Sequence, residues 1–334
     1  MKRIVFTAPR TVELEEVSVP EPGEGRILVR VRTSGISAGT EMTYYRGAPG
    51  LRLGREEYTY PIRPGYEAVG IVEKCGPGVT GFRPGDRVLC AGYHAEYVEV
   101  EAGFSVHLPE NVPDELGTLG MLTVTSAHAV RRAALEYGDR VVVIGLGVVG
   151  ILAARQARLA GAGRVIGVER DPWRLEAARA LGIDPVVDAG KEGALQAILD
   201  ATGGAGADAV IEAAGVPGAI DDALRCVRDR GRIVILGYHT RPFEFHPGEE
   251  FWYKEVDLRA ARAMGPTPGL PLAYTRWTAD RSLEWAVELL AGGTLNLGAM
   301  VTHRFPCTAA ARAYQMIDQH SEDFLQAVFT WDPA

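Results

Sequence analysis

The stretch that decides the fold of this chain is Arg140-Val141-Val142-Val143-Ile144-Gly145-Leu146-Gly147-Val148-Val149-Gly150, which continues into Ala-rich sequence up to residue 160. Residues 140–144 predict a buried strand, and residues 148–160 predict a helix. Between them, the first glycine permits a tight turn, the second lets a pyrophosphate approach the backbone, and the third lets the helix pack against the strand. The context predicts a dinucleotide site at Gly145, Gly147, Val148, Val149 and Gly150.

An acidic residue completes this pattern. Glu169 follows the next predicted strand, 164–168, and lies 19 positions after Gly150. A carboxylate there accepts hydrogen bonds from the ribose hydroxyls of adenosine and repels a 2′-phosphate, which favours NAD over NADP. Arg170 and Arg174 keep NADP open as an alternative, because a guanidinium group binds phosphate well.

The pattern of apolar residues differs between the two parts of the chain. Up to about residue 108, short apolar or alternating runs are broken by Gly and Pro turns, which predicts a β-barrel or sandwich. From about Gly117, Ala- and Leu-rich helical segments alternate with β-branched strands, which predicts a doubly wound parallel sheet of six strands. Asp171-Pro172 predicts the start of one of these helices, and Gly182 predicts its end. The fold class is therefore α/β.

Composition restricts the partners. A formal net charge of −8 over 334 residues gives no reason to expect nucleic acid or an anionic membrane as a partner, although it leaves local basic clusters open. No apolar run approaches the roughly 18 residues of a membrane span. The cysteines, Cys75, Cys90, Cys226 and Cys307, are scattered and predict reduced thiols. We expect a soluble, cytoplasmic protein that acts on a small molecule.

In these features the chain resembles the medium-chain dehydrogenase/reductase superfamily of alcohol and polyol dehydrogenases. Besides the glycine motif, the resemblance is carried by residues 29–47, 64–70, 85–88, 202–215, 231–237 and 301–305. It implies a GroES-like β-barrel catalytic domain (1–122), a Rossmann domain (123–263) and a C-terminal segment (264–334) that returns to the first domain. It also implies a homodimer or homotetramer.

The zinc-binding positions of that family are altered here. Its zinc enzymes use the cysteine of Gly-Ile-Cys-Gly-Thr-Asp, the histidine of Pro-Gly-His-Glu, and a Cys, Asp or Glu seven residues before a helical His. The matching positions hold Ser37 or Ala38, then Tyr66, then Met121, counted back from His128. A Ser, Tyr, Met trio does not supply zinc ligands, so we expect no bound zinc.

Without a metal, another group must stabilise the oxyanion that hydride transfer forms. The resemblance places Thr40 at a proton-relay hydroxyl and Tyr66 at the metal-binding histidine; Ser37 is a further donor, and Glu67 orients or deprotonates one of them. The alternative is that Tyr66 only fills the space of the missing metal.

The resemblance also assigns the nicotinamide end of the cofactor. Thr125 matches a threonine that packs on the nicotinamide, and Ala214, Gly237 and Tyr238 border the same ring. The histidines show no metal-like grouping and are expected to be packing or surface residues; they are His94, His107, His239, His246, His303 and His320.

Three functions remain open. The first is zinc-independent hydride transfer between NAD(P) and an alcohol/carbonyl pair. The second is a quinone or enoyl reductase of the same superfamily, and the third is a catalytically inactive dinucleotide-binding protein. Among zinc-free relatives, the Ser34–Glu41 and Pro64–Glu67 stretches look most like bacteriochlorophyllide-type hydroxyethyl dehydrogenases.

Overall fold

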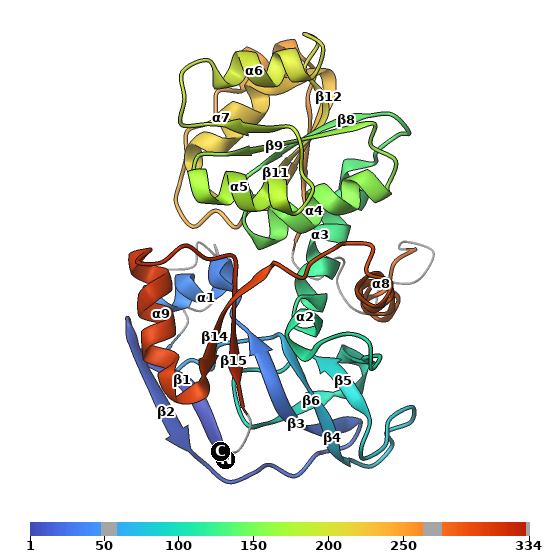
Figure 1. Ribbon diagram of the computed structural model, residues 1–334, viewed down its shortest axis with the longest axis vertical. Coiled ribbons are helices and arrows are strands. Elements are labelled where there is room, and N and C mark those ends of the chain that lie inside the picture. Colours follow the sequence, from blue (N-terminus) through green and yellow to red (C-terminus); the bar gives the residue numbers. More distant parts are fainter. Residues whose placement is uncertain (48–58, 263–275, 332–334) are drawn as a thin grey trace. The chain divides into compact units, whose positions relative to one another are not determined.

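The computed structural model describes residues 1–47, 59–262 and 276–331. The chain forms two compact units, shown in Figure 1. Unit 1 contains Met1–Met121 and Thr267–Ala334, and unit 2 contains Leu122–Pro266. The first unit is thus built from both ends of the chain, whereas the second is continuous.

Unit 1 is organised around a seven-stranded sheet in the order β14-β15-β3-β4-β5-β7, with β6 also paired to β3. The strands are β3 (Arg26–Gly35), β4 (Ala68–Cys75), β5 (Arg87–Cys90), β6 (Tyr97–Glu101), β7 (Ser105–His107), β14 (Val301–Pro306) and β15 (Gln326–Thr330). A separate antiparallel pair joins β1 (Lys2–Ala8) to β2 (Thr11–Glu16). The strands expected up to about residue 108 are confirmed, but the expectation of an all-β region is wrong for residues 38–45, which form a helix.

Helices cover the sheets of this unit and contribute side chains to its hydrophobic core. They are α1 (Ala38–Tyr45), α2 (Asp114–Gly117), α8 (Ala279–Ala291) and α9 (Ala310–Gln319), with short turns at Ala102–Phe104 and Cys307–Ala309. Tyr314 of α9 is fully buried, and its ring centroid lies 4.8 Å from that of Phe6 and 5.6 Å from that of Tyr45. Burial of such large rings fixes α9 and α1 against β1.

Unit 2 is a six-stranded parallel sheet in the order β10-β9-β8-β11-β12-β13. Its strands are β8 (Arg140–Ile144), β9 (Arg164–Glu169), β10 (Val186–Asp188), β11 (Ala207–Glu212), β12 (Val227–Ile235) and β13 (Asp257–Ala260). Its helices are α4 (Val148–Leu159), α5 (Pro172–Ala180), α6 (Ala194–Ala201) and α7 (Pro217–Cys226), with a π-turn at Pro247–Phe251; α3 (Gly120–Ala133) leads into it. The predicted doubly wound sheet of six strands is confirmed.

The order of the strands in unit 2 predicts where a ligand binds. The chain moves outward from β8 through β9 to β10 and then returns to β11, on the other side of β8. In open sheets of this kind, ligands bind beyond the carboxyl ends of the strands at this reversal. The predicted cap of α5 is also present, since Asp171 Oδ1 accepts from the amides of Trp173 and Arg174 and Gly182 follows the helix with φ +80°.

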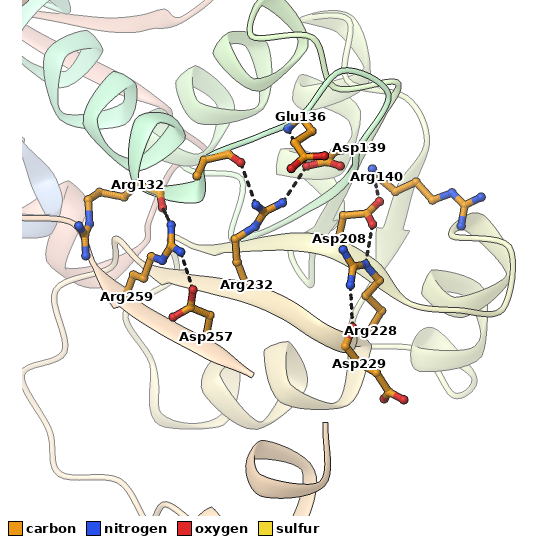
Figure 2. A network of polar contacts seen from close by, with 11 residues as sticks. Arg132, Glu136, Asp139, Arg140, Asp208, Arg228, Asp229, Arg232, Asp257 and Arg259 are labelled. Atoms are coloured by element: carbon orange, nitrogen blue, oxygen red, sulfur yellow. Dashed lines mark hydrogen bonds and ion pairs between the residues drawn. The ribbon is translucent and has the colours of Figure 1, made fainter. Parts of the chain in front are cut away.

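The opposite, amino-terminal edge of the same sheet is held by arginines (Figure 2). Arg232 donates to Asp139 at 2.9 Å, and Arg228 of β12 donates to Asp208 of β11 at 2.6 Å. The side chains of Arg232 and Asp139 are only 16% and 12% exposed, so this pair is screened less than a surface ion pair. Together with the Arg140 amide, which donates to Asp208 at 2.8 Å, these contacts tie β8, β11 and β12 together at the edge that carries no glycine motif.

No helix in the described part of the chain has the length and apolar character needed to span a membrane.

Candidate active site

The glycine turn of unit 2 joins β8 to α4, and its geometry accounts for all three glycines. Gly145 has φ +90°, a conformation that favours glycine. A Cβ on Gly150 would lie 1.8 Å from the carbonyl oxygen of Gly145, so the first turn of α4 packs directly on the loop. A Cβ on Gly147 would meet no atom within 4 Å, which leaves open space beside the N-terminus of α4. The free amides of this first turn, at Val148, Val149 and Gly150, suit a phosphate.

Glu169 lies against this turn, at the carboxyl end of β9. Its Oε2 accepts from the Leu146 amide at 2.9 Å, and its Oε1 accepts from the amides of Arg170 and Asp171 at 2.8 and 3.2 Å. These contacts bring the carboxylate against the glycine turn, and its binding of a ribose stays a prediction. Arg170 is exposed and Arg174 is half-buried on α5.

The loops that follow β11 and β12 form the other half of this edge. A Cβ on Gly237 would lie 2.3 Å from the Gly215 amide nitrogen, and one on Gly145 would lie 2.7 Å from that of Ala214. Glycine therefore allows the three loops to touch. Tyr238 is 49% exposed beside them. Thr125 is buried on α3.

A buried acid and a histidine lie at the same edge, and the sequence analysis missed their pairing. Glu212 ends β11 with no exposed surface, and its Oε2 is 2.9 Å from Nε2 of His239, which follows β12. Its Oε1 accepts from the amides of Ala214 and Gly215 at 2.8 and 2.7 Å. Their positions in the sequence were the only indication of this pairing, because Glu212 ends β11 and His239 follows the adjacent strand β12.

The four residues predicted as catalytic come together in unit 1. Ser37 immediately precedes α1, Thr40 lies in its first turn, and Tyr66 and Glu67 immediately precede β4. Ser37 Oγ and Tyr66 Oη are 2.5 Å apart and either hydroxyl can donate, and Thr40 also hydrogen-bonds Tyr66. Burial, followed by the charge of Glu67, raises the pKa of Tyr66, so this phenol stays protonated.

Glu67 has an environment that is costly for a carboxylate. It is fully buried, and neither of its oxygens makes a regular hydrogen bond to a described residue, although the hydroxyls of Tyr66 and Ser37 lie close enough to lower its pKa. Burial raises the pKa of Glu67 well above its usual range, and the charge of Glu41 raises it further. Gly35 makes room for it, because a Cβ there would lie 2.7 Å from Glu67 Oε2. A carboxyl in this setting gives up its proton only at a pH above its usual range.

A second buried network, which sequence reasoning did not find, holds Ser37 in place. Glu41 accepts from the Ser37 amide at 2.8 Å through Oε1, while its Oε2 accepts from Tyr314 at 2.5 Å and lies 3.1 Å from His94 Nε2. His94 Nδ1 is 2.7 Å from Ser34 Oγ. The sequence prediction for His94 as a packing residue omitted this polar role, and no local pattern marks a pair separated by 53 residues.

The residues of this cluster do not fit the zinc ion that the family's zinc enzymes use. Ser37 and Tyr66 offer hydroxyl groups that bond each other, and Met121 is a fully buried thioether on α3. Only Glu67 is an ordinary zinc ligand. Across residues 1–47, 59–262 and 276–331, no three His, Cys, Asp or Glu side chains are grouped so that they could hold a metal.

Comparison with known proteins identifies the family. Residues 23–114 match the alcohol dehydrogenase GroES-like domain, and residues 148–271 match the zinc-binding dehydrogenase family. D-guloside 3-dehydrogenase of Escherichia coli (strain K12) is 30% identical, over 99% of this chain and all of that protein. Human sorbitol dehydrogenase is 27% identical, over 93% of this chain and 91% of that protein.

A solved structure supports the same conclusion. The alcohol dehydrogenase TADH from Thermus sp. ATN1 superimposes with a TM-score of 0.80, is 25% identical, and aligns over 99% of each chain. The expected combination of a GroES-like domain with a Rossmann sheet is therefore confirmed. The chain belongs to the medium-chain dehydrogenase/reductase superfamily and is an NAD(P)-dependent, alcohol dehydrogenase-like oxidoreductase.

Proposed function

We propose that this oxidoreductase moves a hydride between NAD and an alcohol/carbonyl pair without zinc, and that the hydroxyl cluster of unit 1 does the work of the metal. The observation that carries the proposal is the hydrogen-bonded Ser37–Tyr66 pair, which lies beside a buried carboxyl group. By the resemblance to zinc enzymes, Tyr66 stands at the position of a histidine ligand, and the position of the cysteine ligand falls on Ser37 or Ala38.

The cluster is suited to hold the substrate oxygen. If Ser37 and Thr40 both donate to Tyr66 Oη, the phenol keeps its own proton free for a third partner. Tyr66 would then donate to the oxygen on which negative charge develops. A high phenol pKa matches this role, because Tyr66 remains a donor throughout.

Glu67 is the proposed site of proton exchange. A bound dinucleotide would supply or accept the hydride, and the Glu67 carboxyl would give or take the accompanying proton through the neighbouring hydroxyls of Tyr66 and Ser37. Its raised pKa keeps it protonated in the form needed for carbonyl reduction. Alcohol oxidation needs the ionised form and should accelerate as the pH rises.

We propose NAD as the preferred cofactor because of the contacts of Glu169. Oε1 already accepts two amides, whereas Oε2 accepts one and keeps a lone pair for a ribose hydroxyl. A 2′-phosphate would bring its charge against this carboxylate. Ala214, Gly237, Tyr238 and Thr125 would border the nicotinamide end.

We also propose a homodimer or homotetramer. Among the described strands β13 pairs only with β12 and so lies at the edge of its sheet, and it carries Leu258, which is 36% exposed. An unprotected edge of this kind is a site for pairing with another chain. Light scattering on the purified protein gives the oligomeric state directly.

Metal analysis combined with a chelator tests the proposal. Protein purified without chelators should contain far less than one zinc per chain and keep its activity in 1,10-phenanthroline. The matched control is Ser37→Cys/Tyr66→His, which restores a Cys/His/Glu set with Glu67 and should take up zinc. Stoichiometric, activity-supporting zinc in the unaltered protein would overturn the proposal.

A substrate panel separates the other functions. Secondary alcohols and ketones should turn over with NAD(H). Turnover confined to quinones or enones would indicate a reductase of conjugated bonds instead. Tight NADH binding without turnover on any of these substrates would indicate a binding protein.

A further inference from the structure

The pair formed by Glu212 and His239 has no role in the chemistry described so far. It lies in unit 2, and Glu212 is fully buried while the His239 side chain is 11% exposed. A buried acid and imidazole are costly to desolvate unless their hydrogen bonds are complete. The position of Glu212 and His239, and any polar atom of the pair that lacks a hydrogen bond, therefore call for a physical explanation.

The place of the pair is the half of the sheet that binds the second mononucleotide. Sheets of this order are built from two mononucleotide-binding halves, and the dinucleotide crosses between them. β8 to β10 carry the glycine turn and Glu169, so the adenosine half belongs there. β11 to β13 form the other half, and Glu212 and His239 follow two of its strands. The nicotinamide end of the cofactor is expected over this half.

The tautomer of His239 follows from its partner. Glu212 accepts two backbone amides through Oε1. An ionised carboxylate can only accept, so Nε2 of His239 carries the proton in their 2.9 Å contact. Nδ1 of a neutral imidazole is then an acceptor.

That acceptor is left open. Nδ1 of His239 is buried and has no hydrogen-bond partner among the described residues. The Phe243 ring lies 5.3 Å from the imidazole and contributes to its apolar surroundings. An unpaired polar atom in such a place costs stability, and a ligand that supplies a donor recovers that cost on binding.

We propose that Nδ1 of His239 accepts a hydrogen bond from the carboxamide NH2 of the bound nicotinamide, and that Glu212 is the positioning residue that fixes the imidazole. The pyrophosphate is excluded as the partner because its oxygens only accept. The inference rests on the proposed cofactor site and adds to it a specific contact that selects the carboxamide group.

Two substitutions separate the two nitrogens. His239→Gln keeps a donor at the position of Nε2, which preserves the Glu212 contact but removes the acceptor at Nδ1. His239→Asn keeps a polar atom near the position of Nδ1 but no longer reaches Glu212. The matched control is His246→Gln, because His246 belongs to the same loop and its side chain is 67% exposed.

Three ligands give the readout by calorimetric titration: NADH, its reduced 3-acetylpyridine analogue, which lacks the NH2 donor, and ADP-ribose, which lacks nicotinamide. His239→Gln should bind NADH about tenfold more weakly, the usual worth of one buried hydrogen bond. It should bind the acetyl analogue and ADP-ribose as the unaltered protein does. His239→Asn should lose less NADH affinity, and His246→Gln should lose none.

Each other outcome has a meaning. Unchanged NADH affinity in His239→Gln overturns the contact. Equal loss for NADH and the acetyl analogue assigns His239 to the ribose or ring and overturns the carboxamide assignment. Equal loss for ADP-ribose reveals a structural role for the loop and also overturns it. Failure of the unaltered protein to bind ADP-ribose would instead refute the cofactor site itself.

Discussion

Replacing Tyr66 with phenylalanine is the sharpest test of the hydroxyl cluster, because it removes one oxygen and leaves the ring. The lost Oη lies 2.5 Å from Ser37 Oγ and also bonds Thr40. Both hydroxyls lose a partner, so the free energy of unfolding should fall by about 1–3 kcal/mol. This is the structural part of the effect, and a packing residue would show it as well.

The catalytic part is larger and appears in a different quantity. If Tyr66 donates to the oxyanion, its loss should lower kcat by about 10²–10³-fold, as loss of an oxyanion-hole donor does. kcat and kcat/KM should fall together, because the interaction is made only in the transition state. NADH affinity should not change.

The assay is steady-state kinetics with the best alcohol of the panel at saturating NAD, with urea denaturation in parallel. Tyr60→Phe is the control, since Tyr60 also donates one hydrogen bond, to the Tyr44 carbonyl oxygen at 2.6 Å, outside the cluster. It should lose stability and keep kcat. A Tyr66→Phe enzyme whose kcat stays within about threefold of the original, despite lower stability, would show that Tyr66 only fills space.

Three further predictions concern the glycine turn and two carboxylates. Gly150→Ala should lower Tm and abolish NADH binding, because the new Cβ would lie 1.8 Å from the carbonyl oxygen of Gly145. Gly147→Ala should keep Tm and lose only NADH binding, because its new Cβ would meet no protein atom within 4 Å. Equal Tm losses in the two variants would contradict this. Glu67→Gln should stabilise the protein more at pH 8 than at pH 5. Burial raises the pKa of Glu67 in the folded protein above 4.5, its value in the unfolded chain. The unaltered protein therefore loses stability as the pH rises from 4.5 through the folded-state pKa, and the variant does not. A gain in Tm that is the same at both pH values would refute a protonated Glu67. Glu169→Gln keeps one acceptor oxygen but removes the charge, so the ratio of NADPH to NADH affinity, measured by fluorescence titration, should rise about tenfold; an unchanged ratio would show that another residue sets the preference.

The fold was predictable because its signals are local. The glycine spacing of 145–150, the β-branched runs and the Asp171-Pro172 cap each specify backbone geometry over a few residues. Ser37 and Tyr66 could be assigned to one site only through the resemblance to zinc enzymes, in which the same positions share a metal. Nothing in their 29-residue separation alone requires contact.

The buried networks were not predictable for the opposite reason. Glu41 meets Tyr314 across 273 residues and His94 across 53, and Glu212 meets His239 across 27. These pairings depend on strand order and on which polar atoms remain unsatisfied after the sheets have formed. A single histidine in a sequence gives no indication of which carboxylate it will contact in the folded core.

The split construction of unit 1 has a consequence for how the enzyme is made. β15 lies between β14 and β3, and the amide of Ile36 beside the cluster bonds the Ala327 carbonyl oxygen at 2.9 Å. A ribosome adding about 5–20 residues per second delivers β15 on the order of tens of seconds after β3. During that time unit 2, which is continuous, can complete its own sheet, while residues 33–35 of β3 lack the strand with which they pair. The cofactor-binding fold can therefore form before the hydroxyl cluster is complete, and these residues of β3 stay open to aggregation until β15 is made.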